Sequence, residues 1–226
     1  MIVLDFHGLQ GSQNGQDHSG QVGPVNLYRA DNVPRALQTV EYMAKKYGNH
    51  PNLLALELIN EPHTRWCLYR LLRYYSQAYE IADKYLGKNK KIIVSDAFKP
   101  RRLARVLGRR YSNKRLILDV HLYQLFSKYD MAMSYEKHIE KAAAEWEELL
   151  GDIGQKVPVM VGEWSAALPS GTFSDNPKAA NQQARRYYFT QQQTFENTAW
   201  AYAYWTYKAP GCGLWDWRLS RKILER

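Results

Sequence analysis

Cysteine is scarce in this sequence, and long apolar runs are missing. The two cysteines, Cys67 and Cys212, lie far apart, and neither has a histidine nearby at metal-ligand spacing. The sequence therefore indicates neither a metal site nor a disulfide scaffold, although one long-range bridge is possible. No apolar run reaches about 18 residues, and residues 2–6 are too short and wrongly flanked for a signal peptide. We therefore expect a soluble chain without a membrane span.

The chain also lacks internal repeats, low-complexity segments and a recognisable linker. Its 226 residues, 45% of them hydrophobic, are enough to bury a sizeable core. We therefore expect one domain that spans residues 1–226.

Positive charge is unevenly distributed. The net charge is +9, and residues 99–115 hold eight basic side chains and no acidic one. Leu103, Val106 and Leu107 recur there at helical spacing, which favours an amphipathic outer helix with a solvated basic face. No nucleic-acid-binding motif accompanies the cluster, so we expect no nucleic-acid partner. Attachment to an acidic polymer is the alternative, and it predicts binding that weakens with salt.

Short β-type runs alternate with longer amphipathic stretches. The sequence predicts strands at residues 2–7, 53–59, 91–96, 116–123, 157–163 and 199–207. It predicts helices at residues 32–47, 66–85, 99–107, 135–150 and 181–197. Strands separated by helices indicate βαβ units and a parallel sheet.

Polar and aromatic side chains gather where the predicted strands end. They are His7, Asn60, Glu61, Asp96, His121, Tyr123, Glu163, Trp164, Trp205 and Tyr207. In a (β/α) barrel the carboxyl ends of the strands carry the catalytic groups, because loops vary there while the strands hold positions fixed. The sequence therefore predicts an α/β fold, an incomplete (β/α) TIM-type barrel with about six parallel strands.

Three other acidic residues, Asp5, Glu57 and Asp119, fall on the inward side of their strands but deeper than the strand ends. Buried carboxylates need partners, so we interpret these three as a structural polar layer. Asn60 and Glu61 are adjacent and therefore face opposite ways along a regular strand. Both can face a substrate only where the strand bulges or ends, and the proline that follows them is compatible with an end.

The two glutamates at strand ends, Glu61 and Glu163, suit glycoside hydrolysis. Hydrolysis with retention of configuration needs two carboxyl groups about 5 to 5.5 Å apart, one protonated and one ionised. A negative neighbour and partial burial would raise the pKa of Glu61 and keep it protonated, while Glu163 stays ionised. The competing interpretation of Asn-Glu-Pro is a plain turn after a strand.

Six short segments in order along the chain strengthen the first interpretation. They are Leu-Asp-Phe-His-Gly at 4–8, Gly-Ser-Gln-Asn-Gly at 11–15, Glu-Leu-Ile-Asn-Glu-Pro at 57–62, His-Leu-Tyr at 121–123, Gly-Glu-Trp at 162–164 and Tyr-Trp-Thr at 204–206. Together they resemble glycoside hydrolase family 5, and within it the fungal-type exo-β-1,3-glucanase branch. The resemblance covers essentially the whole chain and implies a β-glucan substrate, a retaining mechanism and no cofactor.

The resemblance also implies roles for single residues. Glu61 becomes the general acid/base and Glu163 the nucleophile, and Asn60 is expected to bind the sugar 2-hydroxyl. His121 and Tyr123 are expected to orient the nucleophile and its sugar.

Two further residues are expected to bind the terminal glucose. His7 would line its subsite, and Trp205 would supply an aromatic floor on which the ring stacks. The plainer interpretations remain open, namely structural histidines at positions 7 and 121 and a core position for Trp205.

The match departs from the family at its start. Relatives have eight strands, and this chain begins at the third, without the strand that carries an arginine near the nucleophile. We expect weaker or looser hydrolysis as a result. Two strand edges would stay open, which favours a truncated chain, a six-strand closure or a homo-oligomer that covers the gap.

Several functional alternatives remain. β-1,4-Glucan or mannan would serve the same chemistry, and a carbohydrate-binding remnant without turnover is a function of another class. Retention of both glutamates favours the enzyme. Relatives are usually secreted, but the sequence leaves the compartment open.

Overall fold

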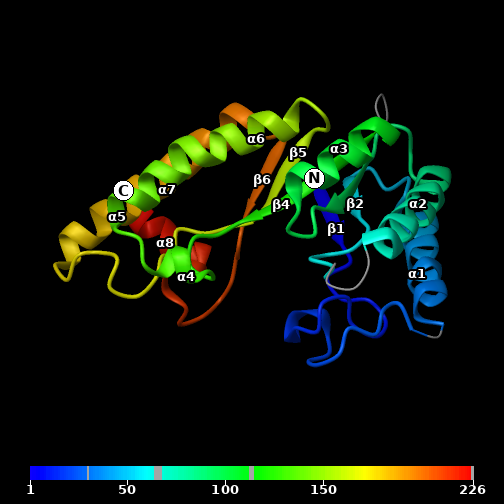
Figure 1. The fold of residues 1–226 in the computed structure, drawn as a ribbon, viewed down its shortest axis with the longest axis horizontal. Helices are drawn as coiled ribbons and strands as arrows, with labels where there is room; N and C mark the ends of the chain where they lie inside the picture. The colour runs from blue at the N-terminus through cyan, green and yellow to red at the C-terminus, as the bar shows by residue number, and fades with distance from the viewer. Residues whose placement is uncertain (30, 64–67, 112–114, 225–226) are drawn as a thin grey trace. The chain divides into compact units, whose positions relative to one another are not determined.

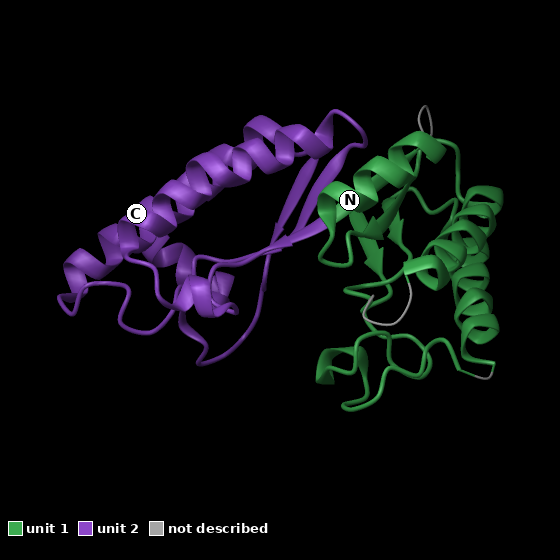
Figure 2. Ribbon diagram, in the orientation of Figure 1, with its two compact units in different colours: residues 1–119 green, residues 120–226 purple. Residues whose placement is uncertain are grey.

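The computed structural model describes residues 1–29, 31–63, 68–111 and 115–224 of the chain. Two compact units make up the fold, Met1–Asp119 and Val120–Arg226 (Figure 2). The strand β4 (Leu116–Leu122) runs across the boundary between them.

The first unit alternates strands and helices, as predicted (Figure 1). Besides the start of β4, its strands are β1 (Ile2–Asp5), β2 (Leu53–Glu57) and β3 (Lys91–Ser95). Its helices are the 3-10 turn η1 (Asp17–Ser19), α1 (Asn32–Tyr47), α2 (Leu68–Tyr85) and α3 (Pro100–Tyr111). β1 pairs with β2, β2 with β3 and β3 with β4, each in parallel.

The second unit holds the parallel pair β5 (Val159–Trp164) and β6 (Ala201–Tyr204). Its helical segments are α4 (Lys128–Met131), α5 (Tyr135–Glu140), the π-helical η2 (Lys141–Glu145), α6 (Trp146–Gly154), α7 (Pro177–Thr198), the 3-10 turn η3 (Gly213–Trp215) and α8 (Trp217–Leu224). Strand order follows chain order from β1 to β6. The predicted set of six parallel strands is therefore confirmed.

Helix α1 has the bounds that the sequence predicts, because its apolar positions repeat every four residues. Ala36, Val40 and Ala44 form its buried face. Gly48 follows the helix at a place where a side chain would not fit, since a Cβ there would lie 2.3 Å from the Ala44 carbonyl oxygen and 2.5 Å from that of Tyr85. Glycine at position 48 therefore lets the end of α1 approach the end of α2 closely.

Two buried tyrosines of α2 fix the ends of neighbouring strands. The Tyr74 hydroxyl donates to the Leu58 carbonyl at 2.8 Å, and the Tyr75 hydroxyl donates to the Ser95 carbonyl at 2.7 Å. Burial raises the pKa of both phenols well above its ordinary value, so both remain donors at any physiological pH. The backbone just before Glu61 is therefore held by a helix as well as by its sheet neighbours.

The core of the second unit is aromatic and centres on Trp164, which is 1% exposed. Its indole stacks on the Tyr188 ring at 5.3 Å between centroids. The rings of Phe195 and Tyr204 meet it edge-on at 5.2 and 5.0 Å. Trp164 follows Glu163 directly, so the packing of the Trp164 indole also fixes the backbone of Glu163.

Some helix boundaries differ from the prediction. The predicted helix 135–150 begins at Tyr135, but a π-helical segment at Lys141–Glu145 interrupts it and the helix continues to Gly154. Hydrophobic periodicity does not distinguish a π turn from an α turn over so few residues. The predicted start of the second helix, with Cys67, lies outside the described residues. Cys212 is an exposed free cysteine, so the structure does not have the long-range bridge that the sequence allows.

Helix α3 carries the predicted basic face. Leu103 and Leu107 are buried together with Ala104, Gly108 and Tyr111, whereas Val106 is 37% exposed, so the buried face is displaced from the predicted one. The arginines at 101, 102, 105, 109 and 110 are exposed. This agrees with a solvated outer face.

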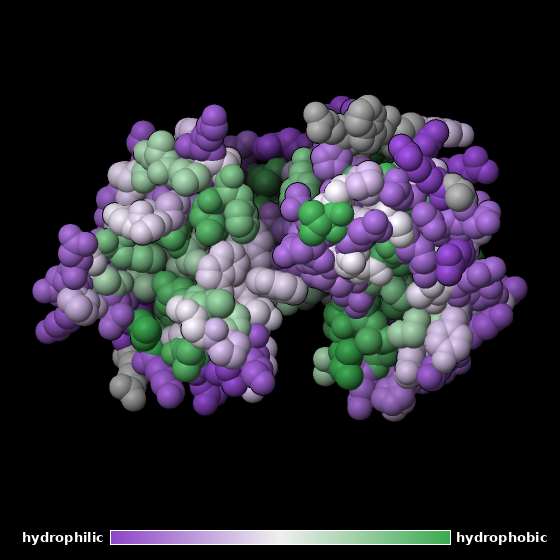
Figure 3. Space-filling view, turned by 90° about the horizontal axis from the view of Figure 1, so that it is seen from below, coloured by the Kyte–Doolittle hydropathy of each residue, from purple (hydrophilic) through white to green (hydrophobic). Residues whose placement is uncertain are grey.

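Polar and apolar groups are intermixed on both units in the face drawn in Figure 3. Among the described residues, no helix combines the length and the apolar character that a membrane crossing requires.

Candidate active site

Glu61 lies four residues beyond the end of β2. The backbone between them is still hydrogen-bonded to the chain of β3 on one side and to the chain after β1 on the other. Leu58 N–H donates to the Ile93 carbonyl at 3.0 Å, and Asn60 N–H donates to the Phe6 carbonyl at 3.1 Å. Glu61 itself has a φ of 41°, in the left-handed region that non-glycine residues rarely adopt. β2 thus ends at Glu57, two residues before the predicted end at 59, and the turn beyond it lets the adjacent Asn60 and Glu61 escape strict alternation.

Gln13 ties the ends of β1 and β2 together. Its side chain is fully buried, and its Nε2 donates to the His7 carbonyl at 2.8 Å and to the Asn60 carbonyl at 2.9 Å. Its Oε1 accepts from Leu9 N–H at 3.1 Å. Gln13 belongs to the Gly-Ser-Gln-Asn-Gly segment that resembles the family, but no structural role was predicted for its side chain.

His7 is held between two polar partners. Its Nδ1 lies 2.7 Å from the Asp5 carboxylate, and its Nε2 lies 3.5 Å from Asn60 Nδ2. Both contacts are satisfied by a neutral imidazole with its proton on Nδ1, because Asp5 accepts and the amide donates. His7 and Asn60 thus lie together, as the sequence predicts.

The predicted buried layer of acids is only partly present. Glu57 and Asp119 are 5% and 1% exposed, in agreement with the prediction. The prediction for Asp5 is wrong, since 29% of its side chain is exposed. Within the described part of the chain, β1 has a strand neighbour on one side only, so an inward position there is not enclosed.

A histidine without a predicted role lies against Glu61. His18 Nε2 is 3.3 Å from Glu61 Oε2. Asn14 Nδ2 lies 2.7 Å from the same ring nitrogen and also donates to the Glu61 backbone carbonyl at 3.1 Å. No sequence pattern marks this contact, beyond the presence of a second histidine in the first twenty residues.

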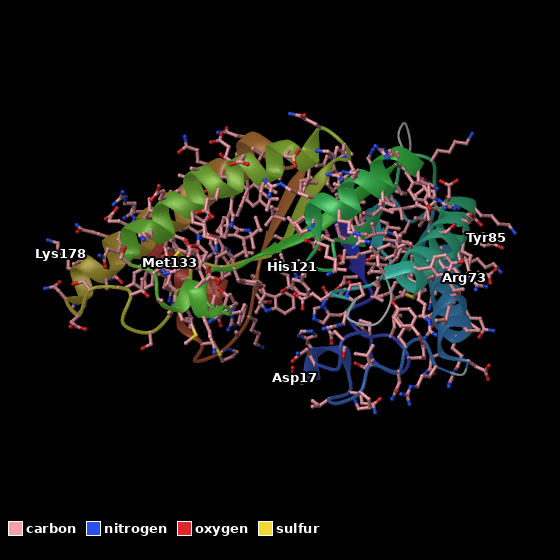
Figure 4. All side chains as sticks on the ribbon, in the orientation of Figure 1. Asp17, Arg73, Tyr85, His121, Met133 and Lys178 are labelled. Atoms are coloured by element: carbon pink, nitrogen blue, oxygen red, sulfur yellow. The ribbon has the colours of Figure 1, made fainter. Side chains whose placement is uncertain are left out.

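In the second unit, Glu163 is held by the end of β4. The Tyr123 hydroxyl donates to Glu163 Oε2 at 2.9 Å, and His121 Nδ1 lies 3.5 Å from the same oxygen. His121, labelled on β4 in Figure 4, has only 4% of its side chain exposed, and Glu163 has 12%. His121 and Tyr123, which the sequence predicts around Glu163, therefore lie with it at two neighbouring strand ends.

Trp205 directly follows β6, and 37% of its surface is exposed. Trp205 is therefore not a core residue. Its backbone N–H donates to the Trp164 carbonyl at 2.8 Å, which ties it to the strand of Glu163. The segment beyond Trp205 is anchored by Asp216, whose carboxylate accepts from Ala209 N–H at 3.0 Å. Arg218 beside Asp216 holds the pKa of that carboxyl below its ordinary value.

An aromatic cluster beside Glu163 was not predicted. Tyr123 lies with its ring centroid 5.3 Å from that of Phe126 and 5.4 Å from that of Trp215. Phe126 is 71% exposed. Phe126 comes from a loop and Trp215 from η3. Neither segment has a hydrophobic periodicity from which the cluster could be predicted.

A family model matches most of the chain, and this match identifies the family. Residues 1–210 match the family model described as "Cellulase (glycosyl hydrolase family 5)". The chain belongs to glycosyl hydrolase family 5. Among curated relatives it is 27% identical to the probable glucan 1,3-beta-glucosidase A of Aspergillus niger and 26% identical to the glucan 1,3-beta-glucosidase of Yarrowia lipolytica. Both alignments cover 95% of this chain and 58% of the relative, so the chain spans little more than half the length of these relatives.

Solved structures agree on the fold. The rutinosidase from Aspergillus niger superposes with a TM-score of 0.74 at 21% identity, over 95% of this chain and 61% of that one. Thermotoga maritima Cel5A superposes with a TM-score of 0.61 at 18% identity, over 88% and 67%. The six parallel strands are thus part of a TIM-barrel fold, as predicted.

We predict that Gln13→Ala lowers the free energy of unfolding by about 2 to 4 kcal/mol, because two carbonyl groups and one N–H lose a buried partner. Urea unfolding followed by tryptophan fluorescence measures this. Gln16→Ala, at an exposed neighbouring glutamine, is the matched control and should change stability by less than about 0.5 kcal/mol. Equal effects of the two substitutions would contradict the bridging role of Gln13.

Proposed function

We propose that this protein is a retaining β-glucanase, with Glu61 as general acid/base and Glu163 as nucleophile, and that it releases glucose from the end of β-1,3-glucan. The observation that carries the proposal is a glutamate at the carboxyl end of β2 and another on β5, in a chain of glycosyl hydrolase family 5. The printed names of the curated relatives support β-1,3-glucan as the substrate class.

The proposed reaction has two displacement steps. In the first, the Glu163 carboxylate attacks the anomeric carbon while Glu61 gives its proton to the glycosidic oxygen, so that the aglycone leaves as an alcohol and a glycosyl ester forms. In the second, Glu61 takes a proton from water as that water attacks the anomeric carbon, and Glu163 leaves as a carboxylate. The two inversions together retain the configuration.

The surroundings of Glu163 suit a nucleophile. A hydroxyl donor at 2.9 Å stabilises the ionised carboxylate and fixes its orientation. His121, at 3.5 Å from the same oxygen, is the second group that limits its rotation. An ionised and oriented carboxylate is what attack on the anomeric carbon needs.

The remaining predicted residues are assigned to the sugar. Asn60, 2% exposed and close to His7 Nε2, is proposed to bind the 2-hydroxyl, and His7 to line the subsite of the terminal glucose. The partly exposed indole of Trp205 offers a flat apolar face for the C–H groups of that ring.

We predict that azide distinguishes the two glutamates. Removing the nucleophile in Glu163→Ala should cut hydrolysis at least about 10³-fold, and azide should then attack from the vacated face and give α-glucosyl azide. In Glu61→Ala the glycosyl ester still forms from an aryl glucoside with a good leaving group, and azide should give the β-glucosyl azide. Proton NMR of the glucosyl azide products distinguishes the α from the β configuration at the anomeric carbon.

Glu147→Ala, at an exposed glutamate of α6, is the matched control and should keep full activity without azide products. The same azide configuration from both variants, or undiminished hydrolysis by either, would contradict the assigned roles.

We predict that laminarin yields glucose as the sole early product, released first as the β-anomer. Chromatography of short incubations and NMR of the nascent anomer measure this, with lichenan, carboxymethylcellulose and mannan as parallel substrates. A ladder of oligomers would contradict exo action, and preferred cleavage of a β-1,4-linked substrate would contradict the linkage. Binding without turnover on all four would favour the carbohydrate-binding alternative.

A further inference from the structure

A buried glutamine anchors the chain just beyond Tyr123. β4 ends at Leu122, so Tyr123 and Gln124 lie past the strand, and residues 126–129 that follow are exposed. The Gln124 side chain is fully buried. Its Nε2 donates to the His138 backbone carbonyl at 3.1 Å, and its Oε1 lies 2.8 Å from His138 Nδ1. One side chain thus makes two hydrogen bonds to one residue of α5.

These two contacts determine which atom donates in each. A backbone carbonyl only accepts, so the Gln124 atom that faces it is the donor Nε2, and the atom that faces the imidazole is the oxygen. An oxygen at 2.8 Å requires His138 Nδ1 to donate. Burial lowers the pKa of His138, which favours the neutral ring. The bond needs only a proton on Nδ1, so it forms in either charge state.

His138 is held firmly by its own surroundings. Its side chain is fully buried in α5, and its ring meets the Tyr187 ring of α7 edge-on at 6.5 Å between centroids. The charged groups that act on it are Asp130 and Lys141, which pair with each other at 2.5 Å and have opposite effects on the His138 pKa. The helix side of the anchor is therefore fixed by packing as well as by hydrogen bonds.

The anchor acts one residue away from the contact with Glu163. Gln124 bonds to a helix, whereas its neighbour Tyr123 donates to Glu163 Oε2 at 2.9 Å. A displacement of the Gln124 backbone would move the Tyr123 hydroxyl. A hydrogen bond weakens steeply when its distance and angle leave their optimum, and one to a carboxylate is among the strong ones. The contact with His138 therefore limits how far Tyr123 can move from Glu163.

We propose that Gln124 and His138 form a positioning pair that keeps the Tyr123 hydroxyl on the Glu163 carboxylate. This rests on the proposed function, in which Glu163 is the nucleophile. The pair acts through Tyr123 and makes no contact with the sugar. Its loss should therefore slow the attack on the anomeric carbon only as long as Tyr123 has a hydroxyl to misplace.

A double-mutant cycle tests this dependence. With 2,4-dinitrophenyl β-glucoside the phenolate leaves without a proton from Glu61, so kcat/KM reports the attack by Glu163. Tyr123→Phe should lower kcat/KM at least about 10-fold, because the carboxylate loses a hydrogen bond. His138→Leu should lower it roughly 5-fold in the unmodified chain and less than about 2-fold in the Tyr123→Phe chain. Equal losses in both chains, or no loss in the first, would overturn the proposal.

Two further variants separate positioning from general destabilisation. His138→Asn, whose Nδ2 can donate to Gln124 Oε1, should restore kcat/KM to within about 2-fold of the unmodified protein. Thr194→Val is the matched control, because it removes another buried hydrogen bond of this unit, from the Thr194 hydroxyl to the Ala142 carbonyl at 2.9 Å. It should lower the midpoint of urea unfolding, as His138→Leu does, and leave kcat/KM unchanged. A loss of activity equal to that of His138→Leu would overturn the proposal.

A readout without turnover separates this proposal from the proposed function. In the full chain with tyrosine carbon-13 at Cζ, the Tyr123 resonance, assigned with Tyr123→Phe, should shift in His138→Leu and Gln124→Met but not in Thr194→Val. Proton–nitrogen NMR of the unmodified chain, which requires no variant to fold, should show His138 with its proton on Nδ1.

An unshifted Tyr123 resonance, or a His138 Nδ1 without a proton, would overturn the positioning pair even in an active enzyme. Absence of hydrolysis of every β-glucoside by the unmodified protein would instead overturn the proposed function.

Discussion

Because β1, β2 and β3 pair in parallel, their carboxyl ends fall on one edge of the sheet, and the reactive groups of the first unit can lie together only there. The hydrogen-bond ladder alone does not fix the residues beyond the strands. Here the buried amide of Gln13 extends it by joining the carbonyls of His7 and Asn60. Glu61 itself adopts a left-handed φ of 41° in the turn beyond β2.

The two glutamates have different hydrogen-bonded surroundings. Glu163 receives a hydroxyl hydrogen bond from Tyr123, which favours a carboxylate. Glu61 lies beside His18, whose Nε2 is 3.3 Å from Glu61 Oε2, and Asn14 Nδ2 donates to the Glu61 backbone carbonyl at 3.1 Å. We propose the roles of acid/base and nucleophile for these two residues, and each residue is held by contacts within its own unit.

Regular features of the structure could be predicted from the sequence, because they depend on periodicity. The bounds of α1, and the presence and order of the six strands, follow from apolar spacing and from the alternation of strand and helix signals. The π segment at Lys141–Glu145 and the exposure of Asp5 could not be predicted, since they depend on local hydrogen bonding and on the absence of a strand neighbour within the described residues. His18 and Trp215 approach the predicted residues through loops, and loop contacts leave no periodic trace in a sequence.

We propose above all that Glu163 forms a covalent bond to the anomeric carbon while Glu61 protonates the leaving group. Incubation with 2,4-dinitrophenyl 2-deoxy-2-fluoro-β-glucoside slows the second step and lets the glycosyl ester accumulate. Mass spectrometry of the digested protein should then find one fluoroglucosyl group per chain on the peptide that contains Glu163. A label on another residue, or hydrolysis of glucosides without any label, would contradict the account.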